Sequence, residues 1–141
     1  MKIQLSQKRY RYLPWAIAAI VCLLLLAGGL SGSNTVTCTE ERVAYLEELG
    51  WCVDPESESA QTVCIPGEFS DVYTRYNELQ QQQGFDLRDY AGKECTLYSY
   101  QVTNALYDDT LVLADLYIKN DRVIAGDIHS TALNGFMVGI R

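Results

Sequence analysis

Residues 94–129 read ECTLYSYQVTNALYDDTLVLADLYIKNDRVIAGDIH, and this stretch decides the fold. Side chains alternate in polarity along 94–103, while 110–118 and 122–129 are richer in Leu, Val and Ile. Alternation with a period of two is typical of strands, and the short polar break at 119–121 predicts a hairpin turn. We therefore expect a three-stranded antiparallel meander in this part of the chain.

Two helices are predicted before the meander. The first follows Thr39, which has the chemistry of a helix N-cap, and ends before Gly50. The second covers residues 69–83, where aromatic and aliphatic side chains recur at helical spacing, and it ends at Gly84. Both helices are amphipathic, so each needs a sheet face to cover.

Two further strands are expected. Segments 51–54 and 62–65 alternate in polarity, and the link 55–60 (PESESA) has the composition of a turn, so a hairpin is predicted between the helices. Residues 130–141 are expected to form an edge strand or a packed tail. The resulting fold class is α+β, a two-layer domain in which an antiparallel sheet of about 4–5 strands carries two helices on one face.

The N-terminus indicates attachment to a membrane. Residues 13–30 (LPWAIAAIVCLLLLAGGL) carry no charge, and as a helix they are about 27 Å long, close to the roughly 30 Å hydrocarbon core of a bilayer. Residues 1–12 hold four basic residues and no acid, which places them in the cytoplasm by the positive-inside rule. The prediction is a transmembrane signal anchor at 13–30, a short tether at 31–38 and an extracytoplasmic domain at 39–141.

The alternative is a cleaved signal peptide, which would leave a secreted domain. Small residues at 27–29 suit a cleavage site. Under either interpretation the exported part is acidic, because residues 31–141 hold all 18 acids and the other seven bases, for a net charge of −11. Such a charge excludes a nucleic-acid partner, which needs a basic face to neutralise phosphates.

Four cysteines lie outside the apolar segment, which contains Cys22. An even number in an exported chain allows two disulfides with three connectivities. A Cys52–Cys64 bond across the predicted hairpin would leave Cys38 and Cys95 as the second pair; the alternative is four free thiols. The wide spacing of these cysteines does not fit a zinc site, and neither a metal nor a cofactor is predicted.

The only histidine, His129, follows Asp127 at the spacing of one strand face. An Asp–His pair can orient a base for a serine or cysteine nucleophile, so both residues are candidates for catalysis. The alternative is a solvated strand face, and the chain has no nucleophile-elbow motif. Tyr98 and Tyr100 alternate along another strand, where they form either an exposed binding surface or part of the core.

Five motifs, in their order along the chain, resemble an uncharacterised family of short membrane-anchored proteins of Gram-positive anaerobes, a domain of unknown function. The resemblance covers about residues 40–138. It implies one exported α+β domain and brings no catalytic residues. The motifs are LGWxVD (49–54), VxIP (63–66), YNxLQxxQGFDLxxYAGK (76–93), AGDIHS (125–130) and GFM (135–137).

The functional prediction is a non-enzymatic, membrane-anchored extracytoplasmic domain that binds a protein or another cell-envelope partner. Residues 13–30 supply the contact with the membrane. Two alternatives remain open. One is a small cell-envelope enzyme that uses Asp127 and His129, and the other is a thiol-based sensor.

Overall fold

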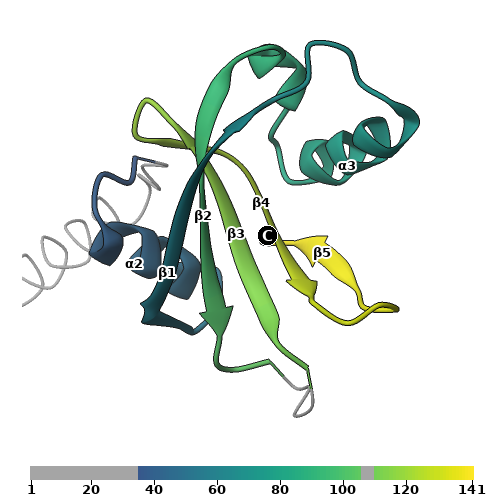
Figure 1. The fold of residues 1–141 in the computed structure, drawn as a ribbon. Helices are drawn as coiled ribbons and strands as arrows, with labels where there is room; N and C mark the ends of the chain where they lie inside the picture. The colour runs from purple at the N-terminus through teal and green to yellow at the C-terminus, as the bar shows by residue number, and fades with distance from the viewer. Residues whose placement is uncertain (1–34, 106–109) are drawn as a thin grey trace, which may run out of the picture. The chain divides into compact units, whose positions relative to one another are not determined.

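The computed structural model describes residues 35–105 and 110–141, and within them a five-stranded antiparallel sheet has the order β1-β2-β3-β4-β5 (Figure 1). The α+β class and the 94–129 meander are therefore confirmed. The elements are α2 (Thr39–Glu48), β1 (Val53–Cys64), α3 (Asp71–Gln82), the 3-10 helix η2 (Leu87–Tyr90), β2 (Glu94–Val102), β3 (Val112–Lys119), β4 (Arg122–Ser130) and β5 (Met137–Gly139).

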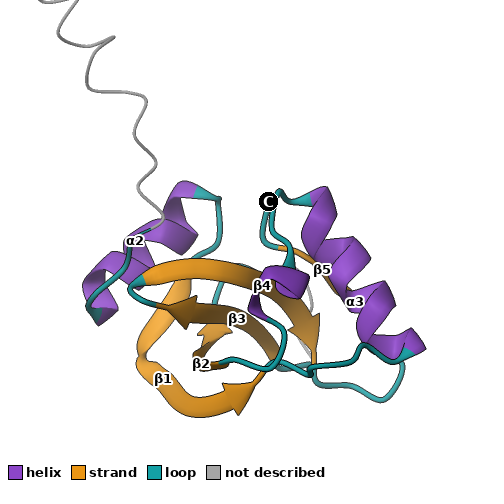
Figure 2. Cartoon of the chain, turned by 90° about the horizontal axis from the view of Figure 1, so that it is seen from above, coloured by secondary structure: helices purple, strands orange, loops and turns teal. Residues whose placement is uncertain are grey.

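The two helices contact opposite faces of the sheet, so the prediction that both cover one face is wrong. Leu46 of α2 packs in the cluster that contains Tyr100 and Ala114, whereas Tyr76 of α3 packs with Tyr117 on the other face. α2 lies against β1, and α3 lies beside β5 (Figure 2). The physical reason is that β3 and β4 bury side chains on both faces of the sheet, so each face needs its own cover.

β1 replaces the hairpin that was predicted from segments 51–54 and 62–65. Its first two residues pair with Gln101 and Val102, and residues 59–64 pair with 94–99, with a register shift between the two parts. Pro55 lies in that irregular part of an edge strand, where a missing N–H breaks no ladder bond. The turn-like composition of 55–60 therefore belongs to a bulged strand.

The length of β1 also rules out the predicted Cys52–Cys64 disulfide. Cys52 precedes the strand and Cys64 ends it, so roughly 30 Å of sheet separates them, far beyond the reach of a disulfide. Cys38 precedes α2, and Cys95 is buried in β2. All four of these cysteines are free thiols.

The turns follow the local signals. Asn120 and Asp121 both have positive φ, 50° and 60°, as the two-residue turn of the β3–β4 hairpin requires. Gly84 ends the helix that was predicted over 69–83, with φ +84°.

The folded unit begins earlier than the predicted boundary at residue 39. Thr35 bridges Arg122, and Val36 is buried with its N–H donating to the carbonyl of Asp121 at 2.7 Å. Residues 35–38 are thus part of the fold and not of a tether.

No helix in 35–105 or 110–141 is long and apolar enough to cross a membrane. The segment 13–30, for which a membrane span is predicted, and the basic segment 1–12 lie outside the described residues.

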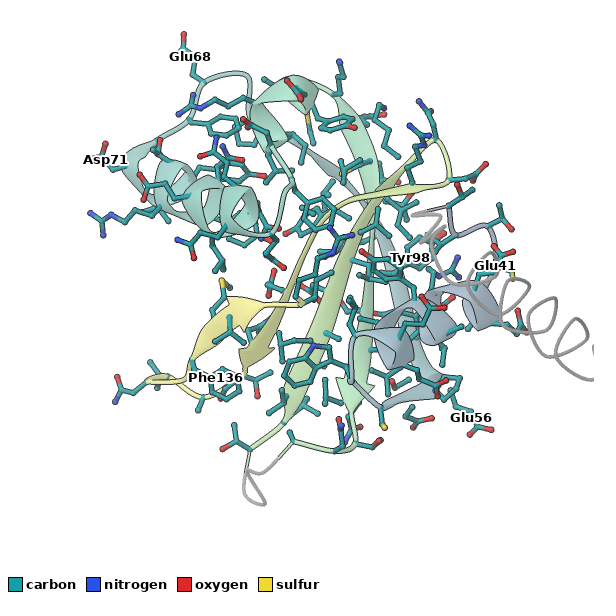
Figure 3. All side chains as sticks on the ribbon, turned by 180° about the vertical axis from the view of Figure 1, so that it is seen from behind. Glu41, Glu56, Glu68, Asp71, Tyr98 and Phe136 are labelled. Carbon is teal, nitrogen blue, oxygen red and sulfur yellow. The ribbon has the colours of Figure 1, made fainter. Side chains whose placement is uncertain are left out.

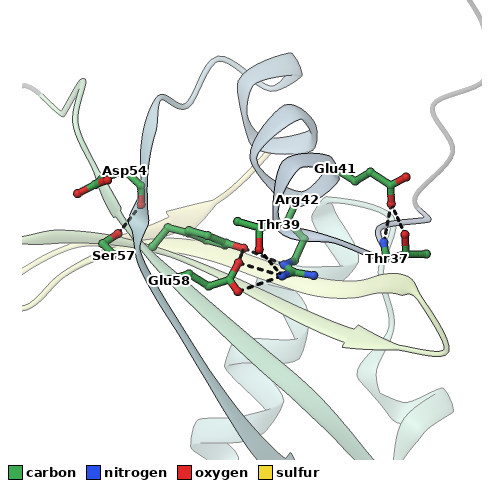
Figure 4. A network of polar contacts seen from close by, with 8 residues as sticks. Thr37, Thr39, Glu41, Arg42, Asp54, Ser57 and Glu58 are labelled. Carbon is green, nitrogen blue, oxygen red and sulfur yellow. Dashed lines mark hydrogen bonds and ion pairs between the residues drawn. The ribbon is translucent and has the colours of Figure 1, made fainter.

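Tyr98 and Tyr100 lie under α2 and do not form an exposed ladder; Figure 3 shows Tyr98 beside that helix. Tyr100 is completely buried, and its hydroxyl accepts a hydrogen bond of 2.8 Å from Nε of Arg42. The Arg42 guanidinium lies 3.8 Å from the centre of the Tyr98 ring. Its Nη2 atom is 2.9 Å from Glu58 Oε2, an ion pair that ties α2 to β1 (Figure 4).

This ion pair makes the stability of the domain depend on pH. Burial raises the pKa of Glu58, but hydrogen bonds from Tyr100 and Arg42 outweigh burial, so the pKa lies below its ordinary value of 4.5. Stability from a carboxyl group with a lowered folded-state pKa is present above the unfolded pKa and is lost as the pH falls through the folded pKa. We therefore expect the free energy of unfolding to fall more steeply below about pH 4.5 in the wild type than in Glu58→Gln.

Urea unfolding, followed by the fluorescence of Trp51 in a Trp15→Phe background, measures this difference from neutral pH down to about pH 3. Because every other carboxyl group is common to both proteins, the difference between their pH dependences of the free energy of unfolding reports on Glu58. Equal slopes for the two proteins would contradict the prediction.

Candidate functional site

A row of polar side chains crosses the sheet on the face that α3 contacts. The register pairs Ser99 of β2 with Asp115 of β3, and Asp115 with Asp127 of β4. His129 lies two residues beyond Asp127 and therefore on the same face. Strand pairing thus brings together residues that lie up to 30 positions apart in the chain.

Hydrogen bonds connect this row to α3. The hydroxyl of Tyr76 donates to Asp127 Oδ2 at 2.6 Å, and Nδ1 of His129 is 2.9 Å from Asp127 Oδ1. Ser99 donates its hydroxyl to Asp115 Oδ1. Both oxygens of Asp127 therefore have hydrogen-bond partners. Asp115 Oδ2 accepts no hydrogen bond from a residue that the structure describes, and His129 Nδ1 lies 3.9 Å from it.

The two carboxylates are buried side by side. Asp127 is 1% exposed and Asp115 is 8% exposed, and like charges directly opposite each other in a sheet destabilise it. Burial raises the pKa of Asp115, and the charge of Asp127 raises it further, despite the Ser99 hydrogen bond and the nearby His129. The hydrogen bond to Asp127 raises the pKa of His129, although burial opposes it. The site therefore favours a positive charge between the two acids.

A pocket of about 590 Å³ lies between α3 and this row. Its floor is polar because Asp115 and Asp127 line it, and its walls are mainly apolar or aromatic. Val72 and Met137 lie at the rim, where they are 76% and 50% exposed. The lining residues are Val72, Tyr73, Arg75, Tyr76 and Leu79 of α3, Asp115, Tyr117 and Asp127 of the sheet, and Met137 of β5.

α3 is held above the pocket by buried amides. Gln80 Oε1 accepts a hydrogen bond from the N–H of Gly126 at 3.0 Å, and Gln83 Nε2 donates to the Gly126 carbonyl at 3.1 Å. Gln83 Oε1 also accepts the N–H of Ile140 at 2.7 Å. The helix therefore completes the hydrogen bonding of the β4 edge where β5 does not reach.

The structure brings only part of the predicted site residues together. Asp127 and His129 are in contact, as their spacing on one strand indicates, whereas Tyr98 and Tyr100 lie on the opposite face. Sequence reasoning did not single out Asp115, although a lone charge within the apolar segment 110–118 was a usable signal. The partners Ser99 and Tyr76 depend on register and on helix docking, for which no local signal exists.

Fold and site together define a small α+β domain with an acid-floored pocket between a helix and an antiparallel sheet. Residues 45–128 match the domain of unknown function DUF4830. This match spans more than half of the chain, so the protein belongs to the DUF4830 family. It agrees with the resemblance to a domain of unknown function and includes Asp115 and Asp127, while His129 lies just beyond it. Neither the curated proteins nor the solved structures include a significant match to the chain.

Proposed function

We propose that the protein is a membrane-attached, extracytoplasmic binding domain whose ligand occupies the pocket beneath α3. The membrane attachment rests on the uncharged segment 13–30 and the basic segment 1–12 before it. The acidic remainder of the chain then faces the outside of the cell.

The pocket is the observation that carries the binding function. Its volume of about 590 Å³ lies in the range typical of small-molecule sites, about 300–1,000 Å³. Apolar walls with a few convergent polar groups suit a ligand with an apolar body and one polar end. Such a ligand is an apolar group of a cell-envelope molecule or of a protein partner, and its polar end meets the two carboxylates.

A polarity-sensitive neutral dye, Nile red, tests whether the pocket takes an apolar ligand. We expect the dye to bind the wild-type chain, and we expect Val72→Glu to weaken binding about tenfold, because it removes an apolar contact and adds a charge at the rim. Dye fluorescence titrated against the purified chain in detergent, with detergent alone as the blank, measures this change.

Leu133→Glu is the matched control, since Leu133 is fully exposed and does not line the pocket. Equal weakening by both substitutions, or no dye binding by the wild type, would overturn the proposal.

A small cell-envelope enzyme is the second candidate, and the 2.9 Å contact between Asp127 and His129 favours it. Among the described residues, however, no serine, threonine or cysteine side chain is hydrogen-bonded to the His129 ring. Turnover of an activated ester that is lost in His129→Ala, with Nile red binding retained, would favour the enzyme. The four described cysteines form no disulfide, which leaves the thiol-based sensor without an observation in its favour.

A further inference from the structure

We propose that Asp115, Asp127 and His129 bind a divalent transition-metal ion at the floor of the pocket. Asp115 gives the first indication, because it is 8% exposed and lines the pocket. Its Oδ2 atom accepts no hydrogen bond from any residue in the described ranges. The side chain is 12% exposed, so this oxygen is accessible from the pocket and free to bind a cation beside the second carboxylate.

The geometry of the three side chains fits one ion. Ligand atoms bound tetrahedrally to Zn²⁺ at about 2.0–2.1 Å are about 3.4 Å apart. Nδ1 of His129 lies 2.9 Å from Asp127 Oδ1 and 3.9 Å from Asp115 Oδ2, values on either side of that separation. Donor atoms of all three residues lie within 4.8 Å of one another. The 4.8 Å limit exceeds the ideal separation by about 1.4 Å, so side-chain shifts of about 1 Å would place an ion between them.

The donor set indicates the kind of metal. One imidazole nitrogen and two carboxylates suit Zn²⁺, Mn²⁺ or Fe²⁺, whereas Ca²⁺ and Mg²⁺ prefer oxygen ligands alone. The ion takes the place of the proton on Nδ1 of His129, and this proton leaves to solvent. His129 then binds as the neutral imidazole, and the two positive charges of the ion neutralise both acids. The buried like charges of Asp115 and Asp127 are then balanced.

The surroundings of the three residues resemble those of an open metal site. Ser99 and Tyr76 donate hydrogen bonds to the carboxylate oxygens that face away from His129, and such contacts orient metal ligands. The protein supplies three ligands, which leaves the fourth position of a tetrahedral ion open, and two of the three, Asp115 and Asp127, line the pocket. A lone pair from the pocket ligand can occupy that position. The cation site does not depend on that ligand and can be tested with metal alone.

The experiment uses the full chain in detergent, stripped of metal, with Zn²⁺ titrated against a chromophoric chelator. We expect one equivalent to bind, and Co²⁺ in its place to give the visible absorption of a four-coordinate site without a sulfur charge-transfer band. A variant carrying Cys38→Ser, Cys52→Ser and Cys64→Ser is the essential control, because exposed thiols also bind Zn²⁺. It is expected to bind as the wild type does.

Asp115→Asn and His129→Gln are each expected to weaken Zn²⁺ binding by at least about 100-fold. The matched control Glu68→Gln removes an exposed acid outside the pocket and is expected to leave binding unchanged. Binding that is absent in the wild type, or that disappears with the cysteines, would overturn the proposal and leave protonated His129 as the cation between the acids. The wild-type Co²⁺ spectrum decides the question even where a variant does not fold.

Discussion

Replacing Gly126 by alanine is expected to lower the free energy of unfolding by about 3 kcal/mol. A Cβ atom at this position would lie 2.7 Å from Ile140 Cδ1 and 2.8 Å from the backbone oxygen of Asp115. The first contact can relax by a side-chain rotation, but the second requires β4 to move away from β3. The amides of Gln80 and Gln83 also bind this residue, so the same movement weakens the docking of α3.

Urea unfolding followed by Trp51 fluorescence, in the Trp15→Phe background, measures the loss for Gly126→Ala. Gly67→Ala is a matched control, because a Cβ there would meet nothing within 4 Å and φ is not in the left-handed region. We expect its effect to stay within about 0.5 kcal/mol. Because Gly→Ala lowers the conformational entropy of the unfolded chain, which by itself stabilises the fold, a loss of the same size at both positions would show that the cost does not arise from the close approach at Gly126.

Replacing Arg42 by methionine is expected to cost about 3 kcal/mol, because it leaves the partners of a buried cation unpaired. Arg42 is 5% exposed and donates to Tyr100, Glu58 and Thr39. Methionine retains much of the apolar stem, so the measured loss reports mainly on the guanidinium. Glu58 remains partly exposed, with 23% of its side chain accessible, and this places the loss at the low end of the range for buried pairs.

A double-mutant cycle separates this ion pair from general damage. The loss in Arg42→Met together with Glu58→Gln is expected to be smaller than the sum of the two single losses, because the second change removes the group that the first left unpaired. Arg75→Met, at an exposed position of α3, is expected to change stability by no more than about 0.5 kcal/mol. Strict additivity in the cycle would contradict the coupling.

The meander and α3 were predictable because their signals are local. Alternation over 94–103, the polar turn at 119–121 and the helical spacing over 69–83 each depend on neighbours within a few residues. β1 was mispredicted since Pro55 and its polar neighbours have the composition of a turn. An edge strand with an irregular register tolerates such residues because its outer side forms no ladder with another strand.

The site was predictable only where one strand supplies both residues. Asp127 and His129 share a face by their spacing, so their contact follows from β4 alone. Asp115 joins them through the β3–β4 register, and Tyr76 joins them through the docking of α3. Gln80 and Gln83, part of a run of four glutamines, are buried because the β4 edge offers them a backbone N–H and carbonyl.

The sequence by itself determined the α+β class, the order of most elements and the acidic character of residues 31–141, and it predicts a membrane segment at 13–30. These properties follow from composition and short-range periodicity, which each segment carries alone. The tertiary structure decided that the helices cover opposite faces, that Cys52 and Cys64 lie at opposite ends of β1, and that two acids and a histidine meet beneath α3. Those outcomes depend on strand register and on which apolar surface each helix covers, and both are settled only when distant segments pack together.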